Sequence, residues 1–131
     1  MATWGSRGLR GSHLEEMINT TNDVYIEKHL AVVQKIPTPI TPVKIDNEKG
    51  HITLAYFEKK STVDYMGACQ GYPVCFDAKE CARDTFPINN IHEHQIQFMD
   101  DFEAQGGIAF IILYFAGRDE AYYLTLKEIY K

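Results

Sequence analysis

Long apolar runs, a regular cysteine pattern and an N-terminal apolar segment are all missing from this sequence. The most apolar stretch, residues 108–116, is much shorter than the roughly 20 residues that a membrane-spanning helix requires. Residues 1–11 are rich in glycine and lack the apolar centre of a secretory signal peptide. The three cysteines are an odd number and do not suggest the disulfide framework of a small secreted domain. We therefore expect a cytoplasmic protein that does not enter a membrane.

An excess of positive charge is missing as well, because the chain carries 13 basic and 18 acidic residues and a formal net charge of −5. Proteins that bind nucleic acid usually rely on Lys and Arg to neutralise phosphates, so this balance weighs against such a role. The charge is uneven, however. Residues 1–66 hold eight basic and eight acidic side chains, whereas residues 67–131 hold five basic and ten acidic ones. Any surface that contacts DNA is therefore expected to draw on the first half.

What remains is the composition of a globular protein, with 131 residues of which 45% are apolar and 24% charged. A chain of this length can bury more than half of its unfolded surface, so we expect one domain, residues 1–131, without structural staples. Residues 1–11, which contain Arg7 and Arg10 among glycines, are expected to form a flexible arm.

The order of apolar periods, turns and prolines predicts an α/β fold in which helices flank a mixed sheet. Pro37, Pro39 and Pro42 exclude a helix or a central strand in their segment. Residues 47–50 are a turn signal within 44–60, which predicts a projecting hairpin that carries lysines. The other expected elements are helices at 12–29 and 90–105, strands at 31–36, 72–79, 108–115 and 120–126, and a turn at 64–71.

Asp77 and Lys79 are the first candidates for chemistry. They are two residues apart on a predicted strand, so their side chains share one face, while the alternating apolar residues Val74, Phe76 and Ala78 take the other. Asp64, in the turn before that strand, can come alongside. Two carboxylates can hold a divalent cation that activates water, and a lysine can stabilise developing charge. An acid and a lysine at this spacing are also common as a solvated pair, so the spacing alone leaves both interpretations open.

A zinc site is the alternative that the thiols raise. The side chains that would form it are Cys69, Cys75, Cys81, His92 and His94. No Cys-x-x-Cys pair is present, and six-residue spacing is not typical of a zinc finger or ribbon. Small buried hydrophobic side chains are therefore the preferred interpretation of the cysteines, and solvated residues at a helix start that of the histidines.

Several motifs together resemble the RecU family of Holliday junction resolvases, within the PD-(D/E)XK nuclease superfamily. The likeness is collinear over nearly all of residues 6–124. It includes Lys-Ile-Pro-Thr-Pro at 35–39, Ala-Tyr-Phe at 55–57, Ser-Thr-Val-Asp-Tyr at 61–65, Phe-Asp-Ala-Lys-Glu at 76–80, Phe-Pro at 86–87 and His-Glu-His-Gln at 92–95.

The resemblance implies a restriction-endonuclease-like fold and cleavage of four-way DNA junctions in recombination and repair. It implies Mg²⁺, with Mn²⁺ as a substitute, held by Thr62, Asp64, Asp77 and Gln95, while Lys79 stabilises the transition state. It also implies a homodimer that nicks opposed strands symmetrically and a stalk, residues 38–60, that enters the junction. The basic side chains expected to contact DNA, on the arm and on the stalk, are Arg7, Arg10, Lys44, Lys49, Lys59 and Lys60.

The sequence departs from the family pattern in three respects: Asp77 stands where the family usually has Glu, the basic N-terminal extension is brief, and the chain ends early, at Lys131. Two other functions remain open. The first is a nuclease of the same superfamily with a different DNA substrate, which substrate preference would identify. The second is a junction-binding domain without catalysis, which a lack of Mg²⁺ or Mn²⁺ binding would identify.

Overall fold

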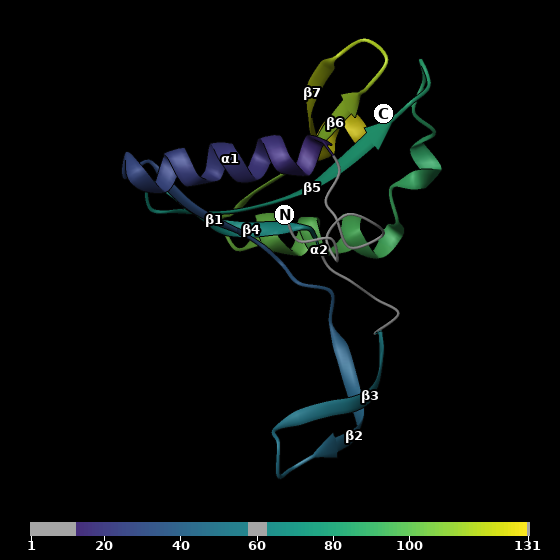
Figure 1. The fold of residues 1–131 in the computed structure, drawn as a ribbon. Helices are drawn as coiled ribbons and strands as arrows, with labels where there is room; N and C mark the ends of the chain where they lie inside the picture. Colours follow the sequence, from purple (N-terminus) through teal and green to yellow (C-terminus); the bar gives the residue numbers. More distant parts are fainter. Residues whose placement is uncertain (1–12, 58–62, 131) are drawn as a thin grey trace.

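A five-stranded mixed sheet with a helix on each face forms the body of the protein, and a two-stranded hairpin projects from it (Figure 1). The computed structural model describes residues 13–57 and 63–130. The elements are α1 (His13–Glu27), β1 (Ala31–Lys35), β2 (Ile40–Asp46), β3 (His51–Phe57), β4 (Tyr65–Cys69), β5 (Tyr72–Cys81), the 3₁₀ turn η2 (Ile88–Asn90), α2 (Glu93–Ala104), β6 (Ile108–Phe115), β7 (Glu120–Thr125) and α3 (Leu126–Ile129). None of the helices within these two ranges is both long and apolar enough to cross a membrane.

The strands of the body lie in the order β1-β4-β5-β6-β7. The central strand β5 is parallel to its neighbour β6, and every other neighbouring pair is antiparallel. A parallel pair needs a crossover connection, and α2 provides it between β5 and β6. The predicted mixed sheet flanked by helices is therefore confirmed.

One face of the sheet packs against α1. Phe76 of β5 stacks between Tyr65 and Phe110, with ring centroids 4.8 Å away on either side. Leu14 and Ile18 of α1 are buried in the same cluster. Because side chains alternate along a strand, the even-numbered residues around Phe76 on β5 lie on this face.

The opposite face packs against α2. Cys75 of β5, Ile111 of β6 and Met99 of α2 have no exposed surface and belong to one apolar cluster. The odd-numbered residues of this part of β5 therefore point towards α2, and Asp77 and Lys79 follow Cys75 on that side.

Strands β2 and β3 form the hairpin that the turn signal at 47–50 predicts, and residues 58–60 of the expected stalk lie outside the described residues. Within the described residues the two strands pair only with each other, and the hairpin extends away from the body (Figure 1). Its tip is closed by Oδ1 of Asp46, which accepts hydrogen bonds from the backbone amides of Glu48 and Lys49 at 3.1 and 3.2 Å. Such an Asx-type turn explains why residues 47–50 reverse the chain.

The turn predicted at residues 64–71 is wrong, because most of that segment is strand β4 between β1 and β5. Gly67 lies within the strand, where a Cβ atom would stand only 1.9 Å from the carbonyl oxygen of Val32. The reversal comes later, at Gln70 and Gly71, which have φ values of 51° and 86°. The short helix α3 was not predicted, and α2 begins at Glu93 rather than at residue 90.

Candidate active site

Asp77 and Lys79 lie together on the side of β5 that faces α2. Asp77 has no exposed surface. Nζ of Lys79 lies 2.9 Å from Oδ2 of Asp77. The lysine keeps 19% of its side chain exposed, so the pair connects the protein interior to solvent. A carboxylate buried this deeply would be costly without a partner, and the ammonium group reduces that cost.

Asp64 joins the pair because β4 and β5 are antiparallel neighbours, with Tyr65 opposite Phe76. The backbone amide of Asp64 donates a hydrogen bond to Oδ1 of Asp77 at 3.0 Å. In return, Oδ2 of Asp64 accepts one from the backbone amide of Ala78 at 3.1 Å. The backbone next to each acid thus holds the carboxylate of the other acid in place.

Gln95 reaches the same place from the first turn of α2, where it is buried. Its Nε2 donates to Oδ2 of Asp77 at 3.2 Å. Its Oε1 accepts from Nζ of Lys79 at 3.2 Å and from the backbone amide of His92 at 3.4 Å. The structure therefore brings four of the predicted site residues together: Asp64, Asp77, Lys79 and Gln95.

The electrostatics of the site centre on Asp64. Burial, and after it the negative charge of Asp77, raises the pKa of Asp64 from 3.8 to about 6. The hydrogen bond from Ala78 and the positive charge of Lys35 lower the pKa of Asp64, but they do not cancel the increase. A cation bound between the two carboxylates would relieve the repulsion that contributes to this shift.

The donor atoms fit a hard divalent cation. Carboxylate oxygens from Asp64 and Asp77 and an amide oxygen from Gln95 are the type of ligand that Mg²⁺ prefers. Within residues 13–57 and 63–130, no three His, Cys, Asp or Glu side chains gather into a group that could hold a metal. A cation here would therefore rely on two carboxylates and an amide. Thr62, the remaining predicted ligand, lies outside the described residues.

The cysteines do not converge. Cys69, Cys75 and Cys81 are free thiols that belong to or pack against three different apolar clusters. The rings of His92 and His94 stack on each other with centroids 5.6 Å apart. Cys75 and Cys81 are buried, as their interpretation as small hydrophobic side chains predicts, whereas Cys69 is half-buried.

Lys35 is a charged neighbour of the site that the sequence did not single out. It pairs with Glu15 of α1 and lies over the ring of Tyr65, 5.5 Å from the centroid. Its charge lowers the pKa of Asp64, so it acts on the site electrostatically. Lys35 comes close to the site because β1 pairs with β4, which places Lys35 opposite Tyr65. The sequence around Lys35 does not by itself indicate this pairing.

The predicted DNA-contacting side chains are only partly within the described structure. Lys44 on β2 and Lys49 at the hairpin tip are exposed on the stalk. The predictions for the flexible arm at residues 1–11 and for four basic side chains fall outside the described residues: Arg7, Arg10, Lys59 and Lys60.

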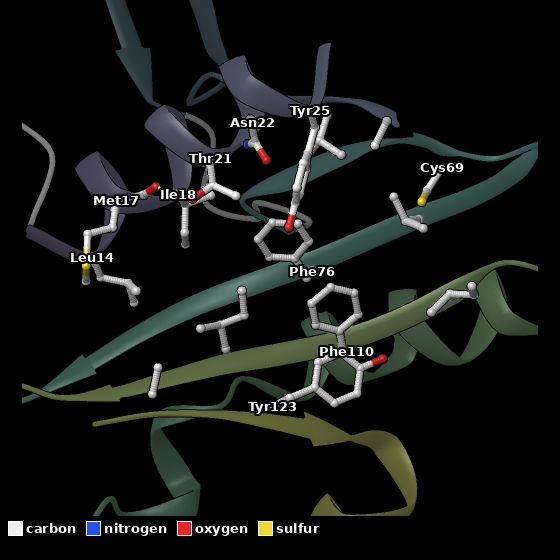
Figure 2. Close-up of a pocket in the computed structure, with 16 residues that line it drawn as sticks. Leu14, Met17, Ile18, Thr21, Asn22, Tyr25, Cys69, Phe76, Phe110 and Tyr123 are labelled. Atoms are coloured by element: carbon white, nitrogen blue, oxygen red, sulfur yellow. Dashed lines mark hydrogen bonds between the residues drawn. The ribbon is translucent and has the colours of Figure 1, made fainter. Parts of the chain in front are cut away.

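A large cavity lies on the other face of the sheet, away from the carboxylates. It has a volume of about 540 Å³ and opens between α1 and strands β5 to β7. Phe76, Phe110, Tyr123 and Tyr25 point into it (Figure 2). Because Phe76 and Asp77 take opposite faces of β5, this apolar cavity is separate from the candidate active site.

A family model and curated relatives both match this chain over most of its length. The model of the family described as "Recombination protein U" matches residues 9–131. The protein named Holliday junction resolvase RecU from Lactococcus lactis subsp. cremoris (strain MG1363) is 50% identical over 121 residues, covering 89% of this chain and 57% of that protein. The protein of the same name from Leuconostoc citreum (strain KM20) is 48% identical over 119 residues, covering 88% and 58%.

Among solved structures, the Holliday junction resolvase Hjc from Archaeoglobus fulgidus aligns with a TM-score of 0.47 and 11% identity, covering 80% of this chain and 74% of that one. The chain spans less than two thirds of the length of the curated relatives that it matches.

Proposed function

The chain belongs to the RecU family, and we propose that it is a metal-dependent endonuclease that nicks four-way DNA junctions in recombination and repair. The observation that carries this proposal is the convergence of Asp64, Asp77, Lys79 and Gln95 at one place. Relatives named Holliday junction resolvase supply the substrate class. The site of action would be the cytoplasm, where the DNA is.

Asp64, Asp77 and Gln95 would hold the cation, together with Thr62. Mg²⁺, or Mn²⁺ in its place, would stabilise negative charge on the phosphate and make water a better nucleophile at neutral pH. Lys79 would keep a positive charge beside the phosphate as its charge develops. The reciprocal hydrogen bonds of Asp64 and Asp77 would hold the carboxylates in place throughout.

The stalk would enter the centre of the junction. Lys44 and Lys49 are exposed on it, so their ammonium groups are available to phosphates. The net negative charge of the chain comes entirely from residues 67–131, whereas the stalk lies in the neutral first half. Arg7 and Arg10, in the first half as well, would add to the same DNA surface.

A homodimer would present two active sites to opposed strands of the junction. The stalk supports this, because Ile52, Leu54 and Tyr56 alternate along one face of β3 and are each 50 to 57% exposed. Ile45 of β2 lies opposite Ile52 and extends this apolar face. Leu54→Lys is expected to reduce the dimer in sedimentation, whereas Thr53→Lys, on the other face of the same strand, is not.

The decisive experiment incubates the protein with a synthetic four-way junction and, separately, with linear duplex of the same sequence. We expect paired nicks in the junction with Mg²⁺ and no nicks with a chelator. Equal cutting of linear duplex would contradict the junction substrate and favour another nuclease of the superfamily. Calorimetry without any uptake of Mg²⁺ or Mn²⁺ would favour a domain that only binds junctions.

A further inference from the structure

The ammonium group of Lys79 contacts one oxygen from each of two residues, Asp77 and Gln95, that the proposed function assigns to a divalent cation. Nζ lies 2.9 Å from Oδ2 of Asp77 and 3.2 Å from Oε1 of Gln95. These two atoms come from different elements, β5 and α2, which only the packing of the helix on the sheet brings together. The lysine therefore contacts two of the proposed ligand residues at once, rather than a single acid at the surface.

The orientation of the Gln95 amide agrees with this. Its nitrogen donates to Asp77, while its oxygen accepts from Lys79 and from the backbone amide of His92. With the amide reversed, the nitrogen would face two donors and the oxygen would face a carboxylate. The hydrogen-bond partners thus define one orientation, in which Oε1 points towards the ammonium group.

Both oxygens of Asp77 already have partners. Oδ1 accepts from the backbone amide of Asp64, and Oδ2 accepts from Gln95 and pairs with Lys79. The backbone amide is fixed by the pairing of β4 with β5. Lys79 has a flexible four-carbon stem and 19% exposure of its side chain, so it is the partner that can leave.

We propose that Lys79 is an internal placeholder for the divalent cation. In the metal-free protein its ammonium group holds Asp77 and Gln95 in a ligand-like arrangement and compensates the buried charge of Asp77. When the cation binds, the ammonium group gives up Oδ2 of Asp77 and Oε1 of Gln95 and turns towards the side where DNA arrives. This inference rests on the proposed metal site, and it makes the release of Lys79 a consequence of cation binding.

If Lys79 is a placeholder, its ammonium group competes with the divalent cation for Asp77 and Gln95. This competition can be measured without DNA or catalysis. In calorimetry with Ca²⁺ alone, Lys79→Met should bind at least about tenfold more tightly than the unaltered protein, because a unit charge is removed and no contact has to be broken. Lys35→Met is the matched control. It removes a charge that also acts on Asp64, but Lys35 pairs with Glu15 and not with Asp77. Its affinity should change by less than about threefold.

If both variants gain affinity equally, the effect is only one of net charge and the placeholder is wrong. A loss of Ca²⁺ affinity in Lys79→Met would overturn it as well. Thermal unfolding adds a second readout. Lys79→Met should unfold at a lower temperature than the unaltered protein without Ca²⁺ and recover more of its stability when Ca²⁺ is added, because only in the metal-free state does Asp77 lack a positively charged partner.

A measurement on the unaltered protein avoids any folding defect of the variant. The side-chain carbon and proton signals of Lys79 next to the ammonium group should shift when Ca²⁺ saturates the site, while those of Lys127 on α3 stay in place. Unchanged Lys79 signals at saturation would overturn the placeholder while the metal site of the proposed function stands. If neither Ca²⁺ nor Mg²⁺ nor Mn²⁺ binds, the metal site of the proposed function fails and the placeholder fails with it.

Discussion

The backbone amide of Asp64 donates a 3.0 Å hydrogen bond to the fully buried carboxylate of Asp77. In the reciprocal hydrogen bond, the backbone amide of Ala78 donates to the carboxylate of Asp64 at 3.1 Å. The two acids are therefore held by the backbone itself, and the site is preorganised before any ligand arrives. Changes to either acid are expected to affect chemistry and stability in separable ways.

Replacement of Asp77 by Asn tests the chemistry. The substitution keeps the size of the side chain and an oxygen that can accept from Asp64, but it removes a charge that a cation would need. Cleavage of a four-way junction should fall at least about 100-fold. Binding of the junction, measured in the presence of Ca²⁺, should change by less than about threefold because the stalk is untouched.

The control for this variant is Asp23→Asn, at an exposed position of α1, which should retain cleavage. Full cleavage by the Asp77 variant would contradict the assignment of this carboxylate. Loss of both cleavage and the cooperative unfolding transition would instead mean that the variant does not fold.

Asp64 makes stability depend on pH. Burial and the charge of Asp77 raise its pKa from 3.8 to about 6 in the folded protein, so the folded state binds this proton more tightly than the unfolded chain does. The stability that the protonated carboxyl contributes is fully present below the unfolded value and is lost as the pH rises through about 6. Asp64→Asn, which stays neutral, should therefore raise the free energy of unfolding at pH 7.5 by about 1 kcal/mol, a value reduced for solvent screening.

The measurement is urea unfolding with a chelator present, at pH 4 and at pH 7.5. The gain of Asp64→Asn should be smaller at pH 4, where the native side chain is largely protonated in the folded state. An equal gain at both pH values would show that the substitution acts through packing or hydrogen bonding. Ca²⁺ in place of the chelator should reverse the order at pH 7.5, since only the carboxylate attracts the cation strongly.

Part of the site could be predicted from local sequence, and part could not. Alternation along one strand is enough to put Asp77 and Lys79 on one face, and Asp64 was expected nearby because it precedes that strand in the sequence. The strand β4 that actually holds Asp64 beside Asp77 was not predicted. Gln95 is different. Nothing in its local sequence distinguishes it from an ordinary polar helix residue, and only the packing of α2 on β5 and β6 brings it to Asp77. The resemblance, not the residue pattern, identified it.

The fold was predictable where a short stretch of sequence carries a strong pattern. Examples are the turn at 47–50, which indicates a hairpin, and the apolar run that forms strand β6. Strand β4 was missed because a glycine in a five-residue segment indicates a turn unless its partner strand is known. The close approach of Gly67 to the backbone of β1 is a tertiary property, which no local pattern carries. Helix α3 has only four residues, too few to show a helical period.

Gly67 gives a test of that close approach. A Cβ atom there would lie 1.9 Å from the carbonyl oxygen of Val32 and 2.6 Å from Cα of Val33, and both are backbone atoms that cannot move alone. Gly67→Ala should lower the free energy of unfolding by about 3 kcal/mol or more. Gly71→Ala, at a positive φ but in open space, should cost only about 1 kcal/mol in the same urea measurement. Similar costs at both positions would mean that β1 and β4 are not this close.

The lysines of the stalk give a test of the DNA surface that is independent of catalysis. Lys44 and Lys49 are exposed on the hairpin, and each phosphate contact that they make releases counterions from the DNA. Lys44→Ala and Lys49→Ala should each weaken junction binding and reduce the slope of log affinity against log salt by about one. Lys127→Ala, on α3 in the body of the protein, removes the same charge and should leave the slope unchanged. If all three variants reduce the slope equally, the stalk has no special part in binding, and the junction is held by general attraction to the whole molecule.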